Sequence, residues 1–274
     1  MTYLRLPSSW AFRGVFALTI LALFVGVSLV FAAQGEASDD TCSNLPSHDA
    51  LKQALGEARH DLDGNGGFDL DMWGTVVNRD GVVCEVAFTG QDRGDQWPGS
   101  RVISAQKANT ANAFSLPGLA LSTANLFSAV QPGGSLFGLQ ASNPVDTAVA
   151  YGGDSSLIGM HNDPMTGKKI GGVNVFGGGL GLYDGDGTLV GAIGVSGDSS
   201  CADHNIAWKT RDALGLDNIP GGVSGTGDDN IVLDLTFSKV LGHTISLSGW
   251  GHPECSSAAT DIGKELPTTH PIGS

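Results

Sequence analysis

Residues Leu189 to Ala207 read LVGAIGVSGDSSCADHNIA, and this stretch decides the fold. Its first half is apolar and rich in glycine, which predicts a β-strand that another backbone or a ligand approaches closely. In its second half, Ser199 or Ser200 can cap a helix over residues 202–214. Gly215 follows as a helix-ending residue. The stretch therefore predicts a strand that leads directly into a helix.

Working outward, further strands are expected in pairs. The turn Asp184 to Gly187 joins the first stretch to apolar residues between Val173 and Leu182, so these segments form a hairpin. An earlier hairpin is predicted over Met72 to Phe88, where Asp80-Gly81 accepts positive φ at both turn positions and closes a two-residue loop. Alternation of apolar and polar residues from Ile231 to Phe237 predicts one extra strand, and a polar tail follows it.

Apolar residues at helical spacing predict three further helices. The first lies between Pro46 and Gly64, the second spans Ser100 to Phe114, and a shorter one spans Leu121 to Val130. Residues 131–172 form a long connection rich in Gly, Pro, Asn and Asp, and connections of this length are usually functional or mobile.

The order of these elements predicts an α+β domain, in which an antiparallel β-sheet of two hairpins plus the extra strand is flanked by helices. A doubly wound parallel sheet is disfavoured, because its crossover connections require strands and helices to alternate singly.

The charge balance excludes some partners. The chain of 274 residues has 28 acidic and 14 basic residues, a formal net charge of −14. The electrostatic field of this negative charge repels a nucleic-acid backbone, so no nucleic acid is expected as a partner. Apolar residues make up 41% of the chain, which is enough for one sizeable core.

The N-terminal segment predicts export. Val15 to Ala33 contains no charged residue, Arg5 and Arg13 precede it, and Glu36 follows it. We interpret residues 1–37 as a signal peptide or as a signal anchor that spans the membrane through residues 15–33. Either alternative places the rest of the chain outside the cytoplasm, in a periplasmic or secreted location.

Cysteine usage agrees with export. Cys42, Cys84, Cys201 and Cys255 are widely spaced and form no C-x-x-C pair, so we expect two disulfides rather than a zinc site. Three pairings are possible. We favour Cys42 with Cys84 and Cys201 with Cys255, because each pair would tie a terminal segment to the body; buried free thiols are the alternative.

Three segments carry a resemblance to a known family. They are SRVISAQKANTANAF (100–114), GGVNVFGGGLGLYDGDG (171–187) and the opening stretch (189–207). Together they resemble the GlcG/HbpS-like family of haem-binding or haem-degrading proteins over about residues 47–215. The resemblance implies a profilin-like, GlcG-like domain over residues 38–216, with residues 217–274 as an extension that packs on it. The compact family pattern lacks this extension and the long connection over residues 131–172.

The resemblance also implies a haem site on the helix over residues 100–114. Family members use a threonine near the haem iron and a nearby basic group, which correspond to Thr110 and Lys107. Ser104, on the same helix face as Lys107, joins them as a cofactor-binding candidate. The haem interpretation expects an apolar crevice between this Ala-rich helix and the two glycine-rich strand pairs. In the alternative reading, Thr110 merely lines a helix interface.

Other candidates come from the residues themselves. His161, beside Met160 in the long connection, could fold over a bound ring as an iron ligand, and a solvated loop histidine is the alternative. His204 follows Asp203 at the start of the predicted last helix, so the two are candidates for an acid/base pair; helix-start polarity is the alternative.

An acidic loop resembles a calcium site. Residues 61–69 follow the D-x-D-x-N-G-x-x-D pattern of an EF-hand loop, but Met72 stands where that loop needs a bidentate carboxylate. We therefore do not expect Ca²⁺ binding.

Three hypotheses of function remain at this stage. The first is an exported, homo-oligomeric protein that holds haem labilely for sensing, transport or protection. The second is an enzyme of the same fold, which degrades haem oxidatively or acts on a small organic acid. In the third, the oligomer is a partner of a membrane sensor protein.

Overall fold

The computed structural model describes residues 39–239 and 242–273, and residues from Asp40 onward form one compact unit. The predicted signal segment, with its apolar stretch 15–33, lies outside the described residues. Within the described ranges, no helix has the length and apolar character needed to cross a membrane. A 3-10 helix, η1 (Asp39–Cys42), opens this part of the chain.

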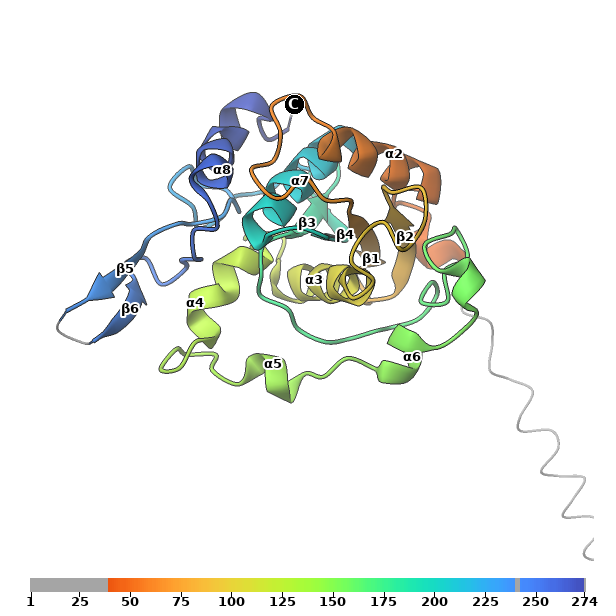
Figure 1. The fold of residues 1–274 in the computed structure, drawn as a ribbon, viewed down its shortest axis with the longest axis horizontal. Helices are drawn as coiled ribbons and strands as arrows, with labels where there is room; N and C mark the ends of the chain where they lie inside the picture. The colour runs from red at the N-terminus through yellow and green to blue at the C-terminus, as the bar shows by residue number, and fades with distance from the viewer. Residues whose placement is uncertain (1–38, 240–241, 274) are drawn as a thin grey trace, which may run out of the picture. The chain divides into compact units, whose positions relative to one another are not determined.

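The core of the fold is a four-stranded antiparallel sheet. Its strands are β1 (Trp73–Asn78), β2 (Val83–Phe88), β3 (Gly179–Tyr183) and β4 (Leu189–Ser196), in the order β2-β1-β4-β3. The two predicted hairpins therefore join through their inner strands, β1 and β4 (Figure 1). The predicted α+β class, with an antiparallel sheet flanked by helices, is confirmed.

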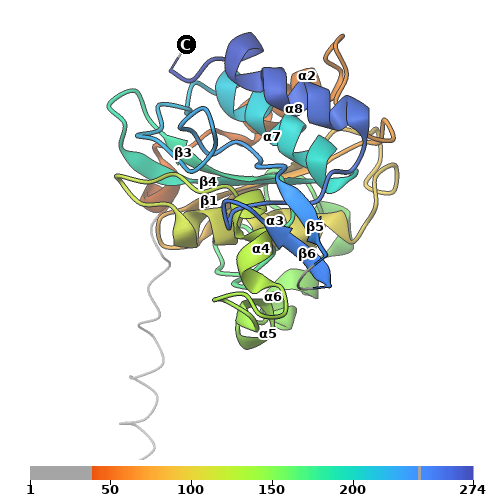
Figure 2. The same ribbon diagram turned by 90° about the vertical axis from the view of Figure 1, so that its left-hand side faces the viewer.

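Helices cover both faces of the sheet. On one face lie α2 (His48–Arg59) and α7 (Ser200–Ala213), and on the other lies α3 (Ser100–Phe114) (Figure 2). Strand alternation divides the core accordingly, since Val76 packs toward α2 and α7 while its neighbour Val77 packs toward α3.

The predicted ends of two helices are found in the structure. The helix α3 begins and ends at the predicted residues. The Ser199 hydroxyl caps α7 by accepting a hydrogen bond from the Ala202 N–H at 3.4 Å, and Gly215 follows with a φ of 62°.

The glycines of the strands let α3 lie directly on the sheet. A Cβ at Gly194 would stand 1.9 Å from the Ser104 carbonyl oxygen, and one at Gly179 would stand 2.6 Å from the Lys107 carbonyl oxygen. The expected close approach is therefore real, and the approaching group is the backbone of α3. The prediction of an apolar crevice between α3 and these strands is wrong, because the backbone of α3 packs directly against their glycines.

Two local predictions need correction. The first hairpin is present, but Asn78 and Val82 close a three-residue loop in which only Gly81 takes positive φ, at 74°. In place of one helix over 121–130, the 3-10 helix η2 (Thr123–Leu126) leads into a single turn, α4 (Phe127–Val130).

The long connection over residues 131–172 contains short helices rather than an irregular loop throughout. They are α5 (Leu139–Ser142), α6 (Thr147–Tyr151) and the 3-10 helix η3 (Ser155–Leu157). Of these, α5 and α6 lie on the α3 side of the sheet (Figures 1 and 2).

The expected extra strand does not join the main sheet. Residues Leu235–Ser238 form β5, which pairs with β6 (His243–Ser246) in a separate two-stranded sheet. Both edges of the main sheet are already engaged: the Val83 N–H donates to Lys168, and the Tyr183 N–H donates to Leu216. The polar tail is not irregular either, because it contains α8 (Ser257–Thr269), which packs on α7.

Candidate functional site

Lys107, one of the residues that the resemblance points to, lies in a buried ion pair. Its Nζ is 2.6 Å from Oδ2 of Asp203 and also donates to the Val195 carbonyl at 3.0 Å. The other carboxylate oxygen of Asp203 accepts hydrogen bonds from the backbone N–H groups of Gly197 and Asp198. Burial raises the pKa of Asp203 to about 6 although Lys107 opposes the rise, and burial lowers the pKa of Lys107.

The side chains of Thr110 and Ser104 are also buried and hydrogen-bonded within the protein. The Thr110 hydroxyl donates to the Gln106 carbonyl at 2.7 Å and accepts from the Asn174 N–H at 3.0 Å. The Ser104 hydroxyl shares a 2.8 Å hydrogen bond with that of Thr75. Neither Thr110 nor Ser104 has any exposed surface.

These three residues do not fit a haem group as they stand. Each is buried, and each has its polar atoms paired within the chain. The backbone of α3 also lies directly against the strand glycines, which leaves no slot between the helix and the sheet. A ring could reach Thr110 only if the buried contacts around it opened, among them its hydrogen bond with Asn174. Their arrangement fixes α3 to the sheet and to α7.

The adjacent residues Asp203 and His204 do not form an acid/base pair. Nε2 of His204 accepts from the Ile231 N–H at 3.1 Å and lies 3.1 Å from the Asn230 side-chain oxygen, whereas Asp203 pairs with Lys107. Burial lowers the pKa of His204 to about 4, so its ring is neutral at physiological pH. With both side chains buried, neither reaches a substrate at the surface.

His161 lies on the surface, next to a small group of ionisable residues on the β2 side. Burial raises the pKa of Glu85, while the nearby His48 and His161 lower it. His48 is held by a 3.0 Å contact between its Nε2 and the Gly159 carbonyl. His161 itself is exposed, whereas Lys107 and Thr110 are buried.

Two carboxylates of the acidic loop that resembles a calcium site are paired with the chain's own cations. Nζ of Lys209 lies 2.6 Å from the carboxylate of Asp61, and the guanidinium of Arg59 lies 2.6 Å from that of Asp69. Over residues 39–239 and 242–273, no group of three or more His, Cys, Asp or Glu side chains is arranged to hold a metal ion.

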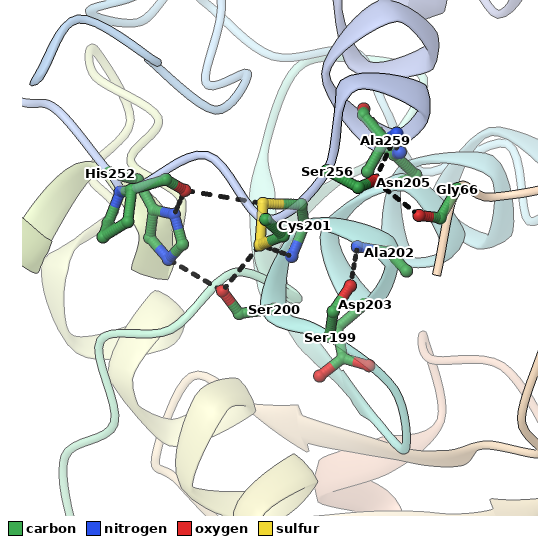
Figure 3. Close-up of a disulfide and its surroundings, with 12 residues drawn as sticks. Gly66, Ser199, Ser200, Cys201, Ala202, Asp203, Asn205, His252, Ser256 and Ala259 are labelled. Atoms are coloured by element: carbon green, nitrogen blue, oxygen red, sulfur yellow. Dashed lines mark hydrogen bonds between the residues drawn. A yellow bond between two sulfur atoms is a disulfide. The ribbon is translucent and has the colours of Figure 1, made fainter. Parts of the chain in front are cut away.

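Both disulfides have the favoured pairing. Cys42 pairs with Cys84 and Cys201 with Cys255, with Cα–Cα distances of 5.7 and 5.9 Å. The second disulfide ties the C-terminal extension to the first turn of α7, where the hydroxyl of Ser200 lies 2.9 Å from Nε2 of His252 (Figure 3).

A cavity that the sequence did not reveal lies on the α3 side of the sheet. Its volume is about 430 Å³, within the range of roughly 300–1,000 Å³ found for small-molecule sites. It lies between the loop over residues 92–99, the first turn of α3, and the segment of α6 and η3. Its apolar lining comes from Trp73, Pro98, Val102, Ala150, Tyr151 and Ile158.

The walls of this cavity are fixed by a buried ion pair. The guanidinium of Arg101 on α3 binds both carboxylate oxygens of Asp163, and its Nη1 donates to the Ala150 carbonyl at 2.9 Å. Asp163 also accepts from the Gly159 N–H at 2.7 Å. The long connection is thereby pinned to α3, because bidentate pairs of this kind are strong and directional.

Local sequence signals for this cavity were weak. Tyr151 is 72% exposed in a polar segment, and Arg93 lies in a turn-rich loop. The one hint in the sequence was Tyr151, an aromatic residue in a long connection. No pattern in the neighbouring sequence indicates that it lies close to Trp73 or Arg101 in the fold.

Comparison with known proteins identifies the family. Residues 48–212, more than half of the chain, match the family described as haem degrading protein HbpS-like. No curated protein sequence matches the chain significantly. Among solved structures, the complex of PduOC with haem is 25% identical, with a TM-score of 0.43, and the match covers 63% of this chain and 96% of that one. Protein ORFY of Klebsiella pneumoniae is 23% identical, with a TM-score of 0.41 and coverages of 62% and 90%. The resemblance found in the three quoted segments is thus confirmed: the chain belongs to the HbpS-like family.

Proposed function

We propose that this protein is an exported haem-binding protein that holds haem reversibly. The observation that carries the proposal is the family match over residues 48–212, whose description is haem-related. The two disulfides support export, because such bonds form and persist in oxidising compartments. When bound, haem would supply its ring iron as a redox-active centre.

Binding is preferred here over catalysis because of where the candidate catalytic residues lie. Asp203 and His204 are buried and paired within the chain, so they cannot exchange protons with a substrate at the surface. The cavity beside Trp73, in contrast, opens between exposed residues and has the volume of a ligand site. A ligand held at an open rim keeps an edge in solvent, which suits reversible transfer for transport, sensing or protection.

The test is a haemin titration of the purified full-length chain, prepared without reductant. We expect a saturable shift of the Soret band and transfer of the bound haem to an excess of apomyoglobin. No saturable shift at any ratio would overturn the proposal.

A second arm of the same experiment separates binding from degradation. Reductant and oxygen are added to the haem-loaded protein, and the Soret band is followed with an iron chelator present. The proposal expects the band to persist. Progressive loss of the band with release of iron would instead identify an enzyme that degrades haem.

Self-association and a sensor partner, which the resemblance implies, belong to the same proposal. Size-exclusion chromatography with light scattering should give a mass above that of a single chain of 28.1 kDa. The value for a single chain would remove the oligomer from the proposal without affecting haem binding.

A further inference from the structure

Resting on the proposed function, we infer that haem enters the cavity beside Trp73, that the phenol oxygen of Tyr151 binds its iron, and that Arg93 pairs with a propionate. This cavity is distinct from the interior residues Lys107 and Thr110. A haem site requires an apolar slot for the ring, an axial donor for the iron and positive or N–H groups for the propionates. Each of the three is present at the cavity.

The apolar slot is formed before any ligand arrives. The indole of Trp73 donates from Nε1 to the Trp97 carbonyl at 3.2 Å, and its ring meets the edge of Phe88 with centroids 5.1 Å apart. Val102 from α3 and Ile158 from the long connection complete the walls. Trp73 is only 1% exposed, so it supports the slot from beneath, and the surface open to a ring comes from Pro98, Tyr151 and Ile158. Because the slot is already packed, little of it has to be ordered when the ring binds.

Tyr151 provides the axial donor. Among the lining residues there is no His, Met or Cys, and tyrosine is a known ligand of haem iron. Tyr151 is the last residue of α6, lines the cavity and is 72% exposed, so a ligand can reach it. The adjoining glycines, Gly152 and Gly153, line the cavity without side chains that would obstruct the ring.

Charge at the rim fits the propionates. Arg93 is exposed at the cavity, where its charge also acts on the nearby carboxylate of Asp154, while Arg101 is engaged by Asp163 and serves the wall. Asp92 also lines the cavity, and its carboxylate accepts from the Gly94 N–H at 2.9 Å within its own loop. In a chain with a net charge of −14, a rim arginine provides local attraction for an anionic ligand.

The first turn of α3 adds backbone donors at the same rim. Its N-cap, Gly99, offers no side-chain acceptor, and no acidic residue lies in the turn. The Ser100 N–H already donates to the Trp97 carbonyl at 2.9 Å, and the other N–H groups at such a terminus favour a carboxylate nearby.

The inference is tested with full-length variants titrated with haemin. Tyr151→Phe keeps the ring and removes the ligand oxygen, and Arg93→Glu reverses the rim charge. The matched controls are Thr110→Ala, at the position that the resemblance implies, and His161→Ala, at an exposed ligand-type residue outside the cavity. Thermal unfolding of each variant verifies that it is folded.

We expect the wild type to show a phenolate-to-iron charge-transfer band in the visible spectrum of its ferric haem complex. Tyr151→Phe should lose this band and bind haemin about tenfold more weakly or worse. Arg93→Glu should keep the band and weaken binding, with the larger effect at low ionic strength. Both controls should retain the wild-type spectrum and affinity.

The outcomes separate this inference from the proposed function. If the wild type binds haemin and Tyr151→Phe binds equally with an unchanged spectrum, the site assignment is wrong and the function stands. Loss of binding in a folded Thr110→Ala or His161→Ala variant also overturns the assignment. If the wild type itself does not bind, both proposals fail.

Discussion

Nζ of Lys107 and Oδ2 of Asp203 lie 2.6 Å apart, although 96 positions separate the two residues in the chain. The pair connects α3, on one face of the sheet, to the first turn of α7, on the other. Gly178 makes the approach possible, since a Cβ there would stand 3.1 Å from Nζ of Lys107 and 2.3 Å from the Val195 carbonyl oxygen. A lysine that looks like a ligand contact in the sequence therefore stabilises the fold.

Removing this lysine should destabilise the protein without affecting haem affinity. Lys107→Met leaves the Asp203 carboxylate buried without its cation, which costs about 3–5 kcal/mol of unfolding free energy. Urea unfolding measures the loss, and the exposed Lys168→Met is the control, with an expected effect within about 0.5 kcal/mol. Equal stabilities for the two variants would show that the buried pair does not support the fold.

A methyl group at Gly194 should disrupt the contact between α3 and the sheet. Its Cβ would meet the backbone of Ser104 at 1.9 Å and that of Ala108 at 2.5 Å, so Gly194→Ala should cost about 3 kcal/mol or more. Gly56→Ala in α2 is the matched control, because its Cβ has no neighbour within 4 Å and alanine favours a helix by about 0.5–1 kcal/mol. Tolerance of Gly194→Ala would contradict the close approach.

Acidification should weaken the fold below pH 6.5. Burial lowers the pKa values of His204 and His252 from 6.5 to about 4, so between these values the unfolded state binds protons that the native state does not. Each histidine then reduces the unfolding free energy by about 1.4 kcal/mol per pH unit as the pH falls. Burial raises the pKa of Asp203 to about 6 and also raises the pKa values of Glu85 and Asp217, so these carboxyls act in the opposite direction and offset part of the loss.

Chemical denaturation at pH 6.5, 5.5 and 4.5 checks this balance. The wild type should lose stability over the series, and His252→Gln should flatten the slope because one of the two histidines is gone. A slope in His252→Gln equal to that of the wild type would mean that His252 is not buried in its neutral form.

The Cys201–Cys255 disulfide should hold the C-terminal extension in place. It spans 54 positions, and the double variant Cys201→Ser/Cys255→Ser should lose about 2–4 kcal/mol and expose the segment around α8 to protease. Limited proteolysis with mass spectrometry locates the first cut. In the matched control, Cys42→Ser/Cys84→Ser, the first cut should not fall near α8. Early cleavage at α8 in both variants would show that the extension is not specifically anchored by Cys255.

Local patterns were sufficient for much of this fold. The bounds of α3 follow from small and apolar residues at helical spacing. The start of α7 was predictable because Ser199 is a residue type that caps helices. The strand glycines correctly indicated a close approach, but they could not say whether a ligand or a backbone made it. The alternation from Ile231 to Phe237 predicted a strand but not the sheet that it joins. The edges of the main sheet are hydrogen-bonded to the distant segments around Lys168 and Leu216, so β5 pairs with β6 instead.

The site could not be predicted in the same way. Arg101 and Asp163 are 62 positions apart, and the cavity that they fix also needs Trp73 from another strand. Such contacts leave no periodic signal in the sequence. The family resemblance directed attention to Thr110, whose hydroxyl has both of its partners inside the fold.

The most direct test locates the iron. Crystals of the full-length chain grown with haemin would give an anomalous difference peak at the iron absorption edge. The account predicts this peak in the cavity lined by Trp73 and Tyr151, with Lys107 still paired to Asp203. An iron peak beside Thr110, with its hydrogen bond to Asn174 broken, would contradict it.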